Sequence, residues 1–104
     1  MEHLEYEFKA AGGATAARKK FCLVGVVASG NLEVMMEHQP LDGKCVLVID
    51  TAAAGFAVSW QAVIADFMDR HHPANLRVSI NDNAASPAVV SLRLDQAYET
   101  LTGE

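Results

Sequence analysis

Alternating apolar and polar residues predict that much of this chain is β-strand. At 3–10, Leu, Tyr and Phe alternate with charged neighbours, which is the period-two pattern of a strand with one buried face. Four later segments repeat this alternation or form short runs of β-branched and apolar residues. The predicted strands are therefore 3–10, 21–28, 32–38, 44–50 and 75–82.

Short polar turns separate the three middle strands. The sequence VVASGNLEV at 26–34 carries a Ser-Gly turn, and QPLDG at 39–43 supplies a proline and an Asp-Gly pair. These residue types favour tight connections between neighbouring strands. The pattern predicts a meander of three sequential antiparallel strands across 21–50.

Two segments instead repeat their apolar residues every three or four positions, which places those residues on one face of a helix. The first spans 55–70 and ends before His-His-Pro at 71–73, because proline disfavours helical geometry in the residue before it. The second opens with Ser86 as N-cap and Pro87 at the first helical position, and it closes at Gly103. The predicted inward-facing residues are Phe56, Trp60, Val63, Ile64 and Phe67 in the first helix and Val90, Leu94, Ala97 and Leu101 in the second.

These elements predict an α+β fold. An antiparallel β-sheet of four to five strands is expected to pack against the two α-helices as a two-layer sandwich. With 104 residues, of which 51% are hydrophobic, the chain suffices for one domain, 1–104, that folds without disulfides or metals. The small, flexible segment at 11–20 is expected to be a loop or a short helical turn.

The chain is acidic. Thirteen acidic and eight basic residues give a net charge of −5 at pH 7, which disfavours nucleic acid and anionic membranes as partners and favours basic protein surfaces. The N-terminal sequence lacks the basic-then-apolar order of a secretory signal, and no apolar run approaches the roughly 18 residues of a membrane span. We therefore expect a cytoplasmic protein.

The two cysteines, Cys22 and Cys45, each lie within an apolar, strand-like run. This placement favours buried free thiols over a disulfide. Neither cysteine belongs to a C-x-x-C pair, and the adjacent histidines His71 and His72 close the first helix, so no metal site is expected.

A single serine, Ser29, stands at the tip of the predicted hairpin at 26–34. The G-x-S-x-G signature of a hydrolase nucleophile is absent, because Val27 and Asn31 occupy its glycine positions. From the residues alone, the Ser29-Gly30 pair is a turn with a structural role.

Three other polar or aromatic features have structural interpretations. Asp82, which follows the last predicted strand, is expected to cap the next turn. Trp60, on the apolar stripe of the first helix, is expected in the core. The basic run Arg18–Lys20 is typical of a solvated surface, although it could also contact the phosphates of a charged ligand.

Three stretches together resemble one protein family. VVASGNLEVMME, SWQAVIADFMDR and INDNAASPAVVSLRLDQAYE are similar, in order and spacing, to the serine turn, the middle helix and the C-terminal segment of the acyl carrier (delta) subunit of malonate decarboxylase. The resemblance runs from about Ala17 to Glu99. A weaker likeness around the serine turn extends to the acyl carrier subunit of citrate lyase. The Asp-Ser-Leu motif of fatty-acid carrier proteins is absent.

The resemblance implies that Ser29 carries a covalent prosthetic group, 2'-(5''-phosphoribosyl)-3'-dephospho-CoA, through a phosphodiester, in a turn completed by Gly30 and Asn31. Asn31 stands where the family commonly has Asp. The chain would carry acetyl and malonyl thioesters on that group and would catalyse nothing alone. The implied partners are the acyltransferase and decarboxylase subunits of malonate decarboxylase, a malonyl transacylase and the transferase that attaches the prosthetic group. The alternative is a non-catalytic interaction domain of the same scaffold without the prosthetic group.

Overall fold

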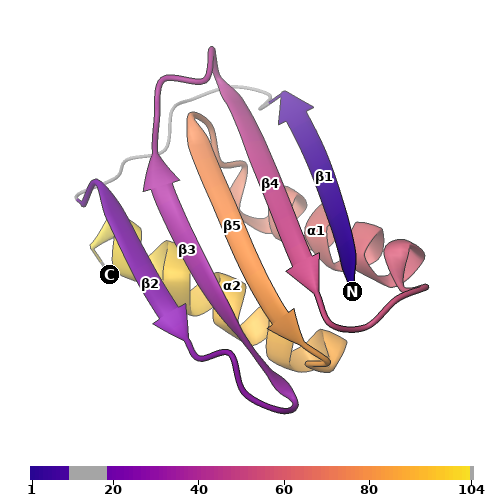
Figure 1. The fold of residues 1–104 in the computed structure, drawn as a ribbon. Helices are drawn as coiled ribbons and strands as arrows, with labels where there is room; N and C mark the ends of the chain where they lie inside the picture. Colours follow the sequence, from indigo (N-terminus) through magenta and orange to yellow (C-terminus); the bar gives the residue numbers. More distant parts are fainter. Residues whose placement is uncertain (10–18, 104) are drawn as a thin grey trace.

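A five-stranded sheet and two helices make up the fold. The computed structural model describes residues 1–9 and 19–103. In chain order the elements are β1 (Glu2–Lys9), β2 (Phe21–Gly25), β3 (Asn31–His38), β4 (Lys44–Thr51), α1 (Ala57–His71), β5 (Leu76–Asn83) and α2 (Pro87–Thr102). Both helices cover the same face of the sheet (Figure 1), which confirms the two-layer α+β architecture expected from the sequence. Most of the predicted loop at 11–20 lies outside the described residues.

The last strand of the sequence lies in the centre of the sheet. The strand order is β1-β4-β5-β3-β2 (Figure 1). The β4–β5 pair is parallel and the other neighbouring pairs are antiparallel, so the sheet is mixed. The predicted meander is therefore wrong, because β2 and β3 pair as expected but β5 separates β3 from β4. A parallel pair needs a crossover connection, and α1 supplies it between β4 and β5.

The connection between β3 and β4 passes over the start of β5. Asn75, just before β5, accepts hydrogen bonds at Oδ1 from the backbone N–H groups of Leu41 (3.0 Å) and Gly43 (2.8 Å). Its carbonyl oxygen accepts a third, from the N–H of Gln39 (2.9 Å). The QPLDG segment was predicted as a tight turn, and it is instead an arch in which three backbone N–H groups bond to Asn75 at the start of β5.

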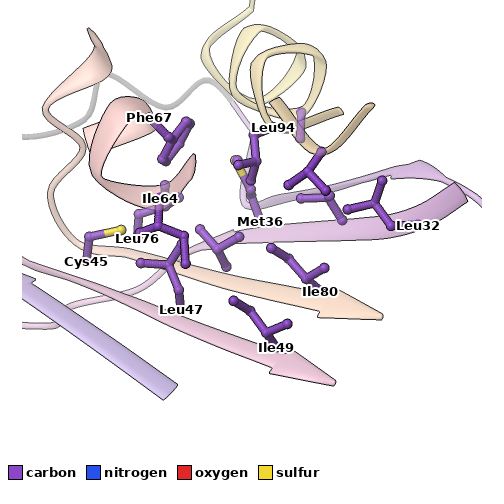
Figure 2. Close-up of a cluster of buried hydrophobic side chains, with 14 of the residues drawn as sticks. Leu32, Met36, Cys45, Leu47, Ile49, Ile64, Phe67, Leu76, Ile80 and Leu94 are labelled. Atoms are coloured by element: carbon purple, nitrogen blue, oxygen red, sulfur yellow. The ribbon is translucent and has the colours of Figure 1, made fainter. Parts of the chain in front are cut away.

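The core lies between the sheet and the two helices. Figure 2 shows side chains of β3, β4 and β5 facing those of α1 and α2. Among the described residues, the hydrophobic side chains with 0–1% exposure are Leu32, Val34, Met36, Cys45, Leu47, Ile49, Ile64, Phe67, Leu76, Val78, Ile80, Leu94, Ala97 and Leu101. Because burying one side chain the size of leucine contributes about 1.5–3 kcal/mol, this layer anchors the strands from which the surface loops extend.

Helix α2 begins and ends as predicted. The Ser86 Oγ accepts a hydrogen bond from the N–H of Val89 (3.3 Å), and Pro87 is the first helical residue. Gly103 closes the helix with φ 88°. All four residues of its predicted stripe are buried.

Helix α1 confirms most of its predicted stripe. Trp60 is only 6% exposed, as expected of a core residue, and Val63 is half-buried. Phe56 was also expected to face inward, and this prediction is wrong, since its side chain is 53% exposed. It is the residue that precedes the helix, with φ −109° and ψ 22°, so the helical spacing does not govern where it points.

Both cysteines are buried free thiols, as predicted. The Cys22 Sγ donates a hydrogen bond to the carbonyl oxygen of Ala97 (3.1 Å) and so links β2 to α2. Burial raises the pKa of the Cys22 thiol and raises the pKa of the Cys45 thiol to about 12. Both residues act as small hydrophobic side chains rather than as nucleophiles.

Candidate functional site

The predicted serine turn lies in the loop between β2 and β3. Strand β2 ends at Gly25, so this connection is longer than the short hairpin turn expected. The N–H of Asn31 donates to the carbonyl oxygen of Ala28 (2.9 Å), which makes Ser29 and Gly30 the two central residues of a β-turn. Gly30 has φ 74°, the conformation required at the second central position of a type II turn.

The Ser29 side chain is accessible. Ser29 and Gly30 are both exposed, and apart from its two chain neighbours no residue lies within 4 Å of the position that a Cβ on Gly30 would take. The hydroxyl makes no hydrogen bond with the described residues, so no base is in place to activate it as in a serine hydrolase. The arrangement instead presents a hydroxyl to an approaching enzyme.

One backbone hydrogen bond fixes the turn to the neighbouring strand β5, and a local one orders the start of β3. The N–H of Gly30 donates to the carbonyl oxygen of Asn83 at the end of β5 (2.8 Å). The Oδ1 of Asn31 accepts from the N–H of Leu32 (2.8 Å). Asn31 also pairs with Asn83 in the antiparallel register of β3 and β5. The serine is therefore exposed on a turn whose backbone is held in place.

Arg93 of α2 lies beside this turn. Its Nε donates to the Asn31 Oδ1 (3.3 Å) and its Nη1 to the Gln96 Oε1 (2.8 Å). Its side-chain stem passes near Gly25, where an added Cβ would lie 3.4 Å from the Arg93 Cδ. Arg93 was not predicted as a site residue from the sequence. The sequence feature that could have indicated it is a cation next to the buried stripe of an amphipathic helix. The stem of such a side chain can pack on apolar surface while its charged head reaches the solvent at the edge of the helix.

The basic run predicted as a possible phosphate contact lies elsewhere. Lys19 and Lys20 precede β2, and the N–H of Lys19 donates to the carbonyl oxygen of Leu101 near the end of α2 (3.2 Å). Ser29 follows the other end of β2, and the five residues of that strand span roughly 17 Å. Arg18 lies outside the described residues. The described part of the run is therefore separated from the serine turn by the length of β2.

Asp82 has the capping role predicted for it. Its Oδ1 accepts from the N–H of Ala85 (3.0 Å), and its Oδ2 accepts from the Thr51 hydroxyl (2.8 Å) and the N–H of Ala84 (3.1 Å). Asp82 is 6% exposed and Thr51 is 1% exposed. The carboxylate therefore joins the ends of β4 and β5 and orders the segment that leads into α2.

A pocket of about 290 Å³ opens next to Asp82, between the first turns of the two helices. Its walls are mainly apolar, with Phe56, Trp60, Val63 and Val90 among the lining residues. The carboxylate oxygens at its base are already occupied by three hydrogen bonds. The pocket is an apolar recess without a free acid or base, so we assign it no catalytic role.

An ion cluster joins α1 to α2 away from the serine. Asp95 accepts hydrogen bonds from Arg70 and from the His71 Nε2 (2.9 Å). The His71 ring lies 4.5 Å from the Tyr98 ring, centroid to centroid. Burial acts to raise the pKa of Asp95, but the bonds from His71 and Arg70 outweigh it and hold this pKa below its usual value. The cluster fixes the helix that carries Arg93.

The described part of the chain holds no group of three or more His, Cys, Asp or Glu side chains placed to bind a metal ion. Within residues 1–9 and 19–103, neither helix is long and apolar enough to cross a membrane.

Comparisons with known proteins place these features in a family context. Residues 19–101 match the family model described as ACP, malonate decarboxylase delta subunit (MdcD). A malonate decarboxylase acyl carrier protein of Xanthomonas euvesicatoria pv. vesicatoria is 55% identical over 103 residues, covering 99% of this chain and 97% of the relative. One of the same name from Bradyrhizobium diazoefficiens is 46% identical over 101 residues, covering 97% and 95%. A chain in the crystal structure of a Pseudomonas malonate decarboxylase hetero-tetramer in complex with malonate has a TM-score of 0.82 and 37% identity, covering 97% of this chain and 99% of that one.

Proposed function

Because this chain belongs to the malonate decarboxylase delta-subunit family, the acyl carrier proteins of that enzyme, we propose that Ser29 is the attachment point of the group on which its acyl cargo travels. The observation that carries the proposal is the exposed Ser29 hydroxyl, which makes no hydrogen bond with the described residues. It sits on a turn fixed by the Gly30–Asn83 hydrogen bond. A tether point requires access and a fixed base, and it requires no neighbouring catalytic group.

The group that we propose is 2'-(5''-phosphoribosyl)-3'-dephospho-CoA, joined to Ser29 through a phosphodiester. When bound, its thiol supplies a thioester carbonyl that can accept the negative charge left when malonate loses carbon dioxide. The residues present fit such a group. The hydroxyl is exposed, Gly30 leaves open space beside it, and a guanidinium lies close to the point where the phosphodiester would begin.

In this proposal the chain's own residues act as a mount and not as catalysts. The β2–β3 loop projects the serine, and the sheet holds the loop. Tethering keeps the cargo at high effective concentration for each partner site. We propose as partners the acyltransferase and decarboxylase subunits of the complex, a malonyl transacylase, and the transferase that attaches the group. The net charge of −5 favours docking onto basic surfaces of these proteins.

Co-expression with the transferase followed by intact-mass measurement tests this proposal. The wild-type chain should gain the mass of one prosthetic group, and Ser29→Ala should gain none. Ser59→Ala is the matched control, because Ser59 is also exposed but lies on α1, and this variant should load normally. An unmodified wild-type chain, with a transferase shown to modify another carrier, would overturn the proposal. Full activity of an assembled complex that contains Ser29→Ala would instead favour the interaction domain without the prosthetic group.

A further inference from the structure

We propose that Arg93 binds the phosphate that joins the prosthetic group to Ser29, and thereby holds the first part of the arm against α2. This inference rests on the proposed attachment at Ser29 and adds an anion-binding residue to it. The residue lies on α2, 64 positions after the serine in the sequence, whereas the sequence indicated only the basic run Arg18–Lys20 as a possible phosphate contact.

The position of Arg93 is fixed without its charge being neutralised. The hydrogen-bond acceptors of its guanidinium among the described residues, the Asn31 Oδ1 and the Gln96 Oε1, are oxygens of neutral amides. No carboxylate of the described residues lies within ion-pair distance of it. Arg70 provides the contrast, because it is paired with two aspartates. In a chain with thirteen acids and eight bases, an oriented and unpaired guanidinium beside the serine turn is suited to an anion supplied from outside the fold.

The guanidinium has donors to spare. Arginine has five N–H groups, and Arg93 uses one on Nε and one on Nη1. The Nε bond to Asn31, at 3.3 Å, is longer than the usual 2.9–3.0 Å, so exchanging it for a phosphate oxygen costs little. Two N–H groups in a planar fork match two phosphate oxygens, and such charge-assisted pairs are among the stronger hydrogen bonds in proteins.

The distances along the chain permit this contact. Asn31 is two residues after Ser29, and consecutive Cα atoms lie about 3.8 Å apart. The Ala28–Asn31 hydrogen bond folds these residues into one turn, which brings them closer still. A phosphate on the Ser29 Oγ therefore lies within a side-chain rotation of the guanidinium that already contacts Asn31.

The packing of the Arg93 stem supports the same role. The Cδ lies 3.4 Å from where a Gly25 Cβ would be, so the stem runs beside the end of β2, where the loop that carries Ser29 begins. A lysine could supply the charge from the same helix position, but not the planar fork.

The test compares wild type, Arg93→Gln, Arg93→Lys and a matched control, Arg77→Gln. Arg77 is also half-exposed, and its replacement removes the same unit of charge from β5. Each protein is prepared in three forms: unmodified, with genetically encoded phosphoserine at position 29, and loaded with the prosthetic group as verified by intact mass. The melting temperature is measured for each form at low and high salt.

Modification of Ser29 should raise the melting temperature, and we call this rise the increment. The increment should be larger in wild type than in Arg93→Gln, with a difference on the order of 4 °C for a domain of this size. Arg93→Lys should keep part of this increment, and Arg77→Gln should keep all of it. High salt should shrink the increment, because the pair is partly exposed. In the wild-type protein, which needs no substitution, the Nε–Hε NMR signal of Arg93 should shift on modification while that of Arg70 stays in place.

The outcomes separate this inference from the proposed attachment. If the mass is gained but the increment is equal in wild type and Arg93→Gln and the Arg93 signal does not move, the inference is overturned and the attachment stands. If phosphoserine couples to Arg93 but the transferase adds no mass, the anion site stands and the attachment falls. If neither effect is seen, both are overturned.

Discussion

Two glycines that flank Ser29 should respond very differently to the same change, glycine to alanine. Gly25 (φ 89°) and Gly30 (φ 74°) both have the left-handed backbone conformation, so alanine is strained at either position. Their surroundings differ. A Cβ on Gly25 would lie 2.2 Å from the carbonyl oxygen of Leu32, whereas a Cβ on Gly30 would meet nothing within 4 Å.

The expected magnitudes follow from this difference. Gly30→Ala has only the backbone strain and should lower the free energy of unfolding by about 1–2 kcal/mol. Gly25→Ala has the same strain and must also displace a backbone carbonyl. Leu32 is fully buried and cannot move away freely, so the overlap should add about 1–3 kcal/mol. The total for Gly25→Ala is about 2–5 kcal/mol.

Urea unfolding measures this difference directly. Trp60 is the single tryptophan of the chain and is 6% exposed, so its fluorescence reports loss of the core. With an m-value of about 1 kcal/mol/M, Gly30→Ala should lower the midpoint by about 1–2 M and Gly25→Ala by about 2–5 M. Gly43→Ala is the control, because Gly43 has φ 79° in open space and should behave like Gly30. Equal losses at Gly25 and Gly30 would refute the argument that close approach, and not φ alone, requires glycine at the end of β2.

Changes at three other side chains, Asp82, Asp95 and Cys45, each wholly or partly buried, should have measurable effects. Asp82→Ala removes three hydrogen bonds that the carboxylate accepts and should cost about 3–5 kcal/mol of stability in urea; a loss below about 1 kcal/mol would contradict its capping role. Because the pKa of Asp95 is lowered in the fold, its stabilisation is complete above the unfolded-state pKa of about 3.9 and is lost as the pH falls through the folded-state pKa. Asp95→Asn should therefore destabilise the protein most at about pH 6 and by less as the pH falls below about 3.9, and a pH-independent difference would argue against this. With a pKa of about 12, the Cys45 thiol is ionised in only about one molecule in 10,000 at pH 8, so iodoacetamide should label it only on unfolding; labelling of the native protein at the rate of a free thiol would show that it is not buried.

Local patterns in the sequence predicted the elements well because each depends on near neighbours. The cap at Ser86, the closing Gly103 and the alternation in the strands are short-range features, and the structure confirms them. The strand order was missed because it depends on a choice between partners far apart in the chain. The QPLDG segment connects β3 to β4, and no residue near it indicates that β5 lies between these two strands. The decisive contacts come from Asn75, far along the chain.

In the candidate site, too, the part that depends on neighbouring residues was predicted and the part that depends on the tertiary fold was not. The exposed serine turn was predicted from the adjacent residues at 26–34, whereas Arg93 reaches that turn because α2 packs along β2 and β3. Its role depends on the tertiary fold, so the spacing of charges along the sequence does not reveal it. Whether Ser29 carries the prosthetic group stays a prediction until the mass of the loaded protein is measured.

The central position of β5 also affects how the chain folds while it is being synthesised. A ribosome that has made the chain up to β4 has produced β3 and β4, but each still lacks the strand that lies between them. Until translation reaches Asn83, the facing edges of β3 and β4 keep their backbone N–H and C=O groups unpaired, and such edges are prone to aggregation. The carbonyl that holds Gly30 belongs to that same late residue, so a nascent or truncated chain that contains Ser29 does not yet present it in the finished turn.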